Sequence, residues 1–191
     1  MSDIPIMSMT ARAASALFLS GALALAAGSL AACSVLRTDA IDESKIETAD
    51  AVAAASGWTR AVLSEHYLVI VNVLPGEEMF TNDEKMSMHP TEGELIIDGP
   101  GNEIGEHVRH VEAHVYDRAT GEVVSNVVPV ITVTNRTTGE VFDVEATLME
   151  DLNIGEIDRH YGNNVMIMPD SDLQVHVTLG DEEVSVDGHL D

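Results

Sequence analysis

Cysteine is almost missing from this sequence, which has a single one, Cys33, among 191 residues. A disulfide framework and a zinc site built from paired cysteines each need at least two, so one chain can form neither. Any thiol chemistry would therefore depend on Cys33 alone, and the residues before it indicate another use for this sulfur.

Basic residues are also scarce: lysine and arginine total 9, against 33 aspartates and glutamates, and the formal net charge is -24. A surface of this sign repels polyanions, so we expect no nucleic-acid partner. The same surface concentrates cations near the protein. Only two of the basic residues are lysines, which is typical of adaptation to high salt; an ordinary acidic exported protein is the alternative.

The first 32 residues have the features of an export signal. An apolar run over residues 13–32 follows a short segment that carries Arg12, and it leads into "LAAC". Small residues before a cysteine are typical of a bacterial lipoprotein signal, which is cut before Cys33 so that the sulfur carries lipid. An uncleaved membrane anchor is the alternative, since about 20 apolar residues can span a bilayer. Both readings export the folded part, and lipidation would leave no thiol for catalysis.

Behind the signal, residues 33–60 are polar and then alanine-rich, which predicts a tether with a short helix after the acylated cysteine. Residues 61–191 are then the folded domain. We expect it to be lipid-anchored at the outer face of the cell membrane or in the periplasm.

Aromatic residues make up only 4% of the chain, so the core has to be built from valine, isoleucine and leucine. Short β-rich runs alternate with turn residues at intervals of roughly ten residues, which predicts an all-β fold, an antiparallel β-sandwich of seven to eight strands. Two similar turns, "DRATGEVV" and "NRTTGEVF", are expected to place Gly121 and Gly139 at positive φ. The runs are residues 66–73, 93–98, 108–116, 122–135, 140–149, 163–168, 173–179 and 183–186.

The run over residues 108–116 contains "HVEAH", with a metal-competent side chain at every second position. Side chains of a strand alternate between faces, so His110, Glu112 and His114 form one polar row on the outer face, opposite the core. Two imidazoles at this spacing can share one ion, with the carboxylate as a ligand or as a partner of an imidazole. The solvated face of an edge strand is the alternative.

A second group of soft ligands lies in "KMSMHP", which is expected to be a loop. The thioethers of Met86 and Met88 and the imidazole of His89 suit copper, especially the cuprous ion, and would form a second metal site. The alternative is a loop that folds its methionines under the sandwich. Further along the chain, His160 opens "HYGNN", where Gly162 and Asn163 predict a tight turn that holds the histidine.

Taken in order, "HVEAH", "TLM" and "HYGNN" resemble the periplasmic iron-transport protein family, the copper- and iron-binding, immunoglobulin-like partners of high-affinity iron permeases. The resemblance covers about residues 109–179. It implies an immunoglobulin-like sandwich, with His110 as the first ligand, Glu112 as its acidic neighbour, Met149 as a thioether ligand and His160 as a further ligand.

The chain departs from this family at three points. Asp151 stands where the family has a second methionine, the loop before His160 is longer, and the family's late histidine has no clear counterpart, with only His176 and His189 as candidates. His114 stands where the family has an aspartate, so it could supply the missing imidazole.

The sequence thus predicts an anchored, non-enzymatic protein that binds copper or iron for metal uptake or homeostasis. Its metal ligands would come from His110, Glu112, His114, Met149 and His160, and its partners would be the membrane, through the lipid anchor, a metal permease and a second copy in a homodimer. The rival interpretation is a metal-free adhesion or assembly module on the same anchor. No hydrolase triad, phosphate loop or HExxH pattern supports an enzyme.

Overall fold

The computed structural model describes residues 57–191. The predicted signal peptide, the lipid attachment at Cys33 and nearly all of the predicted tether lie outside this range. Within the described residues, no helix combines the length and the apolar character that a membrane span requires.

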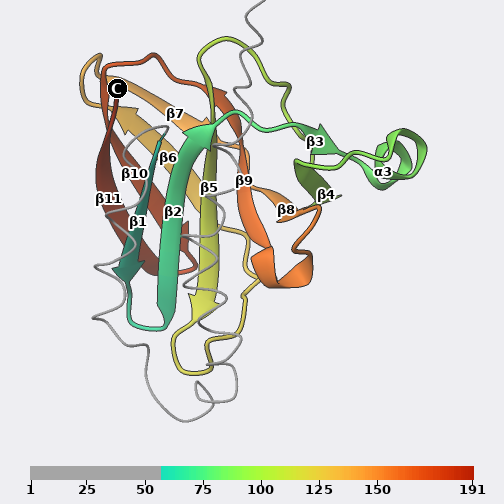
Figure 1. Cartoon of the computed structure of the whole chain (residues 1–191). Helices are drawn as coiled ribbons and strands as arrows, with labels where there is room; N and C mark the ends of the chain where they lie inside the picture. Colours follow the sequence, from blue (N-terminus) through green and yellow to red (C-terminus); the bar gives the residue numbers. More distant parts are fainter. Residues whose placement is uncertain (1–56) are drawn as a thin grey trace, which may run out of the picture.

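The larger of the two sheets has seven strands in the order β1-β2-β5-β9-β8-β4-β3 (Figure 1). All neighbouring strands in it are antiparallel except β3 and β4, which are parallel. The strands are β1 (Trp58–Leu63), β2 (Tyr67–Pro75), β3 (Met79–Phe80), β4 (Glu94–Asp98), β5 (Val108–Asp117), β8 (Thr147–Asp151) and β9 (His160–Met166).

The smaller sheet has four antiparallel strands in the order β11-β10-β6-β7. They are β6 (Val130–Asn135), β7 (Glu140–Val144), β10 (Ser171–Leu179) and β11 (Glu182–Leu190). The two sheets confirm the predicted all-β sandwich, although the described residues form eleven strands where seven to eight were expected.

The hydrophobic core is rich in valine, as the low aromatic content predicts. On β5, Val111, Ala113 and Val115 are at most 1% exposed and belong to the core cluster, together with valines of β2, β6 and β10. The predicted alternation of this strand is confirmed, because the polar residues between them take the other face. The large sheet therefore has an apolar face toward the core and a polar face that carries "HVEAH".

Two predicted strands have different limits in the structure. The run over residues 140–149 is divided into β7, in the small sheet, and β8, in the large sheet, so the chain changes sheets between them. The run over residues 122–135 forms a strand only from Val130 onward, with a single bridge between Val123 and Tyr116 before it. The first strand begins at Trp58, before the predicted domain boundary at residue 61.

The loop predicted around "KMSMHP" is a helix, α3 (Asn82–Met88), which projects beside β3 and β4 (Figure 1). Thr81 caps it: its hydroxyl accepts from the backbone N–H of Glu84, whose carboxylate accepts from the backbone N–H of Thr81. This reciprocal pair is a capping box, which satisfies two backbone donors at the helix start. Another short helix, the 3-10 helix η3 (Glu156–Asp158), precedes β9.

The two similar turns have the predicted backbone, with φ of 71° at Gly121 and 80° at Gly139. In each turn, a side-chain oxygen of the first residue accepts hydrogen bonds from two backbone N–H groups inside the turn. Asp117 accepts from Ala119 and Thr120, and Asn135 does the same for the turn before β7. The likeness of the two phrases therefore reflects one turn structure used twice.

Candidate metal centre

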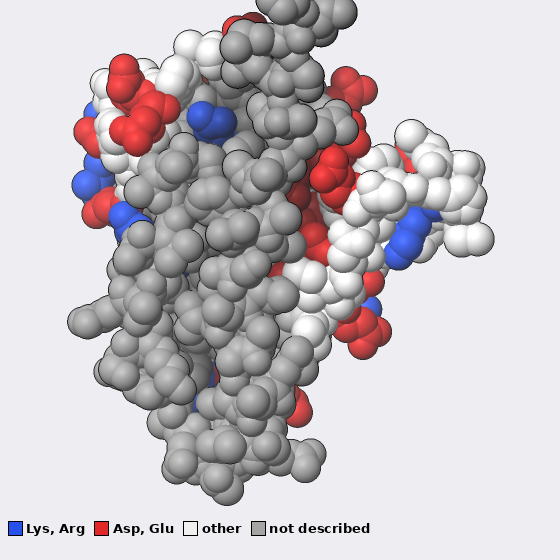
Figure 2. Space-filling model, viewed as in Figure 1, with Lys and Arg blue, Asp and Glu red and all other residues white. Residues whose placement is uncertain are grey.

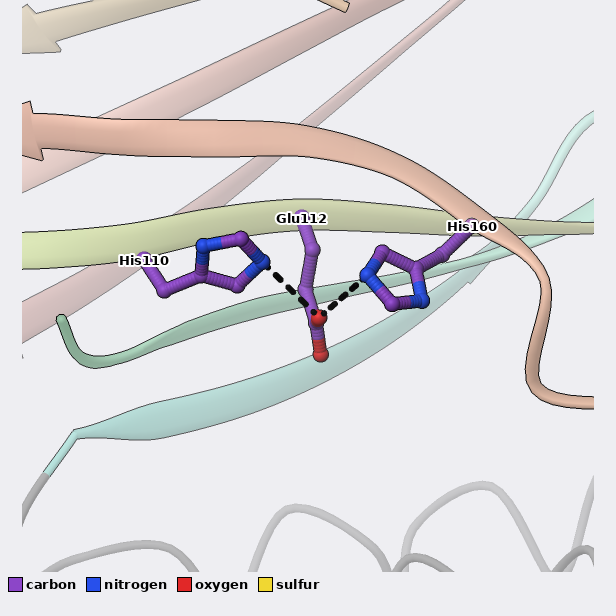
Figure 3. Close-up of side chains that lie close together, drawn as sticks. All are labelled: His110, Glu112 and His160. Carbon is purple, nitrogen blue, oxygen red and sulfur yellow. Dashed lines mark ion pairs between the residues drawn. The ribbon is translucent and has the colours of Figure 1, made fainter. Parts of the chain in front are cut away.

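Two neighbouring strands bring the central residues of the site together. His110 and Glu112 lie on β5, and His160 is the first residue of β9, the next strand in the large sheet. Figure 3 shows the carboxylate of Glu112 between the two imidazole rings. The structure thus joins the predicted "HVEAH" and "HYGNN" stretches in one site.

Gly162 allows this close approach because it is paired directly with Glu112. Paired residues of adjacent strands point to the same face, so a side chain at position 162 would compete with Glu112 for space. A Cβ there would lie 2.8 Å from the Cα and 2.9 Å from the Cβ of Glu112. The glycine of "HYGNN" therefore serves a strand contact. The predicted tight turn is wrong, since residues 160–166 form β9.

The polar row of β5 is buried, contrary to the expectation of an outer, exposed row. His110 is 0%, Glu112 5% and His114 7% exposed, and β5 lies between β2 and β9. The alternative of a solvated edge strand is therefore wrong as well. Buried polar groups of this kind need partners, because leaving them unpaired costs about 1–3 kcal/mol each.

The two carboxylate oxygens of Glu112 have different neighbours. Oε1 accepts hydrogen bonds from the side-chain amide of Asn72 and from Nε2 of His114, which is 3.1 Å away. Oε2 lies 3.4 Å from Nε2 of His110 and 3.2 Å from Nε2 of His160. One oxygen is thus fixed by donors, and the other faces the two histidine nitrogens.

The ring of His160 is oriented by the backbone. Its Nδ1 lies 2.8 Å from the carbonyl oxygen of Asp158, at the end of η3. A carbonyl can only accept, so Nδ1 carries the proton, and the neutral ring has its lone pair on Nε2. This lone pair points toward the carboxylate oxygen Oε2 of Glu112 with no hydrogen bond between them. Two electron-rich atoms in this position call for a cation or a proton between them.

Four buried side-chain atoms of the site make no hydrogen bond in the described structure: Nε2 of His110, Nε2 of His160, Oδ1 of Asn72 and Oε2 of Glu94, a residue of β4. Oε2 of Glu94 lies 3.7 Å from Nε2 of His160. Ligand atoms of His110, Glu112 and His160 all lie within 4.8 Å of one another, and so do those of Glu94, Asp158 and His160. Nδ1 of His160 is occupied by the carbonyl of Asp158, and the carboxylate of Asp158 lies on this same side of the ring, 3.7 Å from Nδ1. Glu94 is on the Nε2 side, so we treat His110, Glu112, His160 and Glu94 as one donor set.

The charges of the site follow from burial and close contacts. Burial lowers the pKa of His160 to about 4, so this imidazole is neutral at neutral pH. For His114, burial is outweighed by the carboxylate of Glu112, and its pKa rises to about 9. For Glu112, burial is outweighed by the imidazoles of His160 and His114, and its pKa falls well below the usual value. The site therefore combines an ionised carboxylate with a neutral ligand histidine.

Other carboxyl groups nearby hold their protons more tightly. Burial and the negative charge of Glu112 raise the pKa of Glu77 to about 7 and that of Glu94 well above its usual value. The pKa of Asp158 rises to about 6, mainly through burial. A dication placed among these groups would favour their ionised forms, so metal binding would release protons.

Two predicted ligands have distinct places. His114 lies beside the centre, with its ring 4.7 Å from that of His160, but its Nε2 donates to Glu112 and so holds the carboxylate. Met149 is fully buried on β8 and is paired directly with His160, which places it on the same face of the sheet. Met149 therefore lies beside His160, and the role of thioether ligand that the family resemblance implies stays a prediction.

The residues of the predicted second metal site, Met86, Met88 and His89, do not converge as those of the first site do. Met86 and Met88 are 73% and 64% exposed on α3, and His89 ends this helix in a left-handed conformation. Residues two apart on a helix point about 200° apart, so the two thioethers leave opposite sides of α3. The late histidines are on the other sheet: His176 contacts Ser185, and His189 contacts Asp172, all on β10 and β11.

Some residues of the site were not predicted, chiefly Glu94, Asp158 and the asparagines at positions 72 and 164. Glu94 is the second residue of the strand predicted over residues 93–98, but only the pairing of β4 with β8 brings it next to β9. Asp158 acts through its backbone carbonyl, for which the residue type gives no signal. Long-range strand pairing was the missing information.

Comparison with known proteins found no matching family model, no matching curated protein and no matching solved structure, so the family resemblance stays a prediction.

Proposed function

We propose that the protein binds a transition-metal ion, copper or iron, at a site formed by His110, His160, Glu112 and Glu94, and that it serves metal uptake or homeostasis outside the cytoplasm. The observation that carries this proposal is the convergence of unpaired buried atoms. Nε2 of His110 and Nε2 of His160 lie 3.4 Å and 3.2 Å from Oε2 of Glu112, and Oε2 of Glu94 lies 3.7 Å from Nε2 of His160. These two nitrogens and the Glu94 oxygen make no hydrogen bond.

The donor types narrow the class of ion. Imidazole nitrogens suit copper, iron and zinc, whereas calcium and magnesium prefer sites made only of oxygens. Two imidazoles and two carboxylates favour divalent ions over the cuprous ion, which prefers sulfur; Met149 is the thioether that borders the set. Copper and iron in their divalent states are therefore the ions to test first, with zinc as a competitor.

The surface charge supports the same function. Figure 2 shows several groups of acidic side chains and few basic ones on the described surface in this view. With a net charge of -24, the chain attracts cations and speeds their encounter with the protein. A metal-free adhesion module would gain nothing from two buried imidazole nitrogens that face carboxylates. The family resemblance implies a metal permease, which would receive the bound ion.

The test is a calorimetric titration of the full chain with Cu²⁺, Fe²⁺ and Zn²⁺. We expect one tightly bound ion in the wild type and none at this site in a His110→Ala, His160→Ala double variant. His176→Ala, which removes a partly exposed histidine from the other sheet, is the matched control and should bind as the wild type does. If the wild type binds none of the three ions, the proposed function is wrong and the metal-free module becomes the better interpretation.

A further inference from the structure

We propose that Asn164 is a positioning residue of this centre: its side-chain amide sets the tautomer of His110, so that Nε2 is the nitrogen left free for the metal. This inference rests on the proposed function for its meaning. Its structural part concerns the metal-free protein and can be tested by itself.

The amide of Asn164 is held in one orientation. It is 2% exposed, and its Nδ2 lies 2.7 Å from the carbonyl oxygen of Glu77 and 2.9 Å from that of Asn102. Both carbonyls can only accept, so the NH₂ group has to point at them. The backbone N–H of Glu77 donates to Oδ1 at 3.1 Å, which independently identifies the oxygen. None of these three hydrogen bonds would survive a flip of the amide.

His110 is paired directly with Asn164 across β5 and β9, and its Nδ1 lies 3.2 Å from Oδ1 of Asn164. Since Oδ1 is an acceptor, Nδ1 has to carry the proton. A neutral imidazole has only one N–H, so the lone pair is then on Nε2, the atom that lies 3.4 Å from Oε2 of Glu112. Without this contact, the ring would be free to place its proton on either nitrogen.

Partners that orient a ligating histidine contribute strongly to metal binding: their loss lowers affinity by about 10- to 100-fold. We therefore expect Asn164→Ala to lower affinity within this range for the ion that the wild type binds. Asn164→Asp keeps an oxygen opposite Nδ1 and should restore the tautomer, although it loses the two amide donors.

Asn163 provides a matched control. It is 0% exposed, and its amide donates to the carbonyl oxygen of Pro100 and to the hydroxyl of Thr147, while its Oδ1 accepts from the backbone N–H of Asn102. Asn163→Ala thus removes a similar number of buried hydrogen bonds from the same strand, but none of these bonds involves a histidine. A general loss of structure would affect both Asn163→Ala and Asn164→Ala. A specific effect on His110 would appear only in Asn164→Ala.

The experiment is ¹⁵N NMR of the histidine rings in the metal-free full chain, at a pH high enough to keep His110 neutral, with His110 assigned from a His110→Gln variant. We expect the Nδ1–H tautomer in the wild type, in Asn163→Ala and in Asn164→Asp, and a mixture of tautomers in Asn164→Ala. The wild-type spectrum needs no variant that might fail to fold, and an Nε2–H tautomer there would overturn the proposal.

Titration of the same proteins with Cu²⁺ and Fe²⁺ completes the test. An affinity loss in Asn164→Ala but not in Asn163→Ala supports the proposal, and equal losses in both variants overturn its specific part. If the wild type binds no ion, the proposed function fails, whereas the ring spectra still decide whether Asn164 sets the tautomer.

Discussion

Gly162→Ala is the substitution for which the structure makes the sharpest prediction. The added Cβ would lie 2.8 Å from the Cα and 2.9 Å from the Cβ of Glu112, and it would also overlap the backbone oxygen of Val111. These neighbours are backbone or rigidly held atoms of a central strand, so β5 and β9 have to move apart by several tenths of an ångström. Overpacking of this kind costs typically 1–3 kcal/mol, and we expect about 3 kcal/mol here.

The same movement should weaken metal binding. His160 and Glu112 are on the two strands that separate, and their ligand atoms now lie 3.2 Å apart. We expect an affinity loss of roughly 10- to 100-fold, the range known for disturbed ligand orientation. Urea unfolding gives the stability of the variant, and calorimetry at a temperature where it remains folded gives its affinity.

Gly139→Ala is the control for a destabilised but undisturbed site. Gly139 has a φ of 80° in the turn before β7, and a Cβ added there would meet no atom within 4 Å. Alanine at this position therefore costs about 1–2 kcal/mol through backbone strain alone. Metal affinity should stay at the wild-type value. If Gly162→Ala binds metal as tightly as Gly139→Ala does, the argument that Gly162 makes room for the site is refuted.

Three further predictions concern protonation. Metal affinity should fall as pH falls through and below neutrality, because protons then compete with the ion for Nε2 of His110, whose pKa Glu112 raises against the effect of burial. Calorimetry over a pH series would show a constant affinity if histidine did not bind the ion. Glu112→Gln should lower the pKa of His114 from about 9, since burial would then be opposed only by the weaker effect of Asp158, and an unchanged NMR titration would contradict this. The metal-free protein should lose stability between pH 6.5 and 9, because the pKa of His114 is raised on folding and its contribution, about 3 kcal/mol, is present below 6.5 and lost toward 9. The pKa of Glu77 is raised from 4.5 to about 7, so this residue lowers stability as pH rises over that range, mainly below the window of His114. Urea unfolding that shows constant or rising stability between pH 6.5 and 9 would refute this account.

The sequence predicted the parts of the fold that depend on local alternation. Val111, Ala113 and Val115 were assigned to the core face of β5 from their period of two, and the structure confirms this. The same period could not reveal that His110 and Glu112 are buried, because alternation separates two faces without showing which of them is covered. Burial here depends on how distant segments pack.

The remaining errors have similar causes. The run over residues 140–149 has uniform β character, and nothing within it indicates that β7 and β8 belong to different sheets. At "HYGNN", glycine and asparagine have turn propensities, but the contact of Gly162 with Glu112 and the hydrogen bonds of Asn163 and Asn164 favour a strand. Tertiary contacts overrode local preference in the stretch that matters most for the site.

The two ligand histidines differ in what orients them, and this difference has a consequence for sequence change. The ring of His160 donates to the backbone carbonyl of Asp158, a group that every amino acid supplies, so substitutions at position 158 would leave this acceptor in place. The ring of His110 donates to a side chain, which a single substitution can remove. The orientation of His160 should thus tolerate substitution at position 158, whereas the orientation of His110 should be lost on substitution at position 164. Among related chains, we expect position 158 to vary more than position 164.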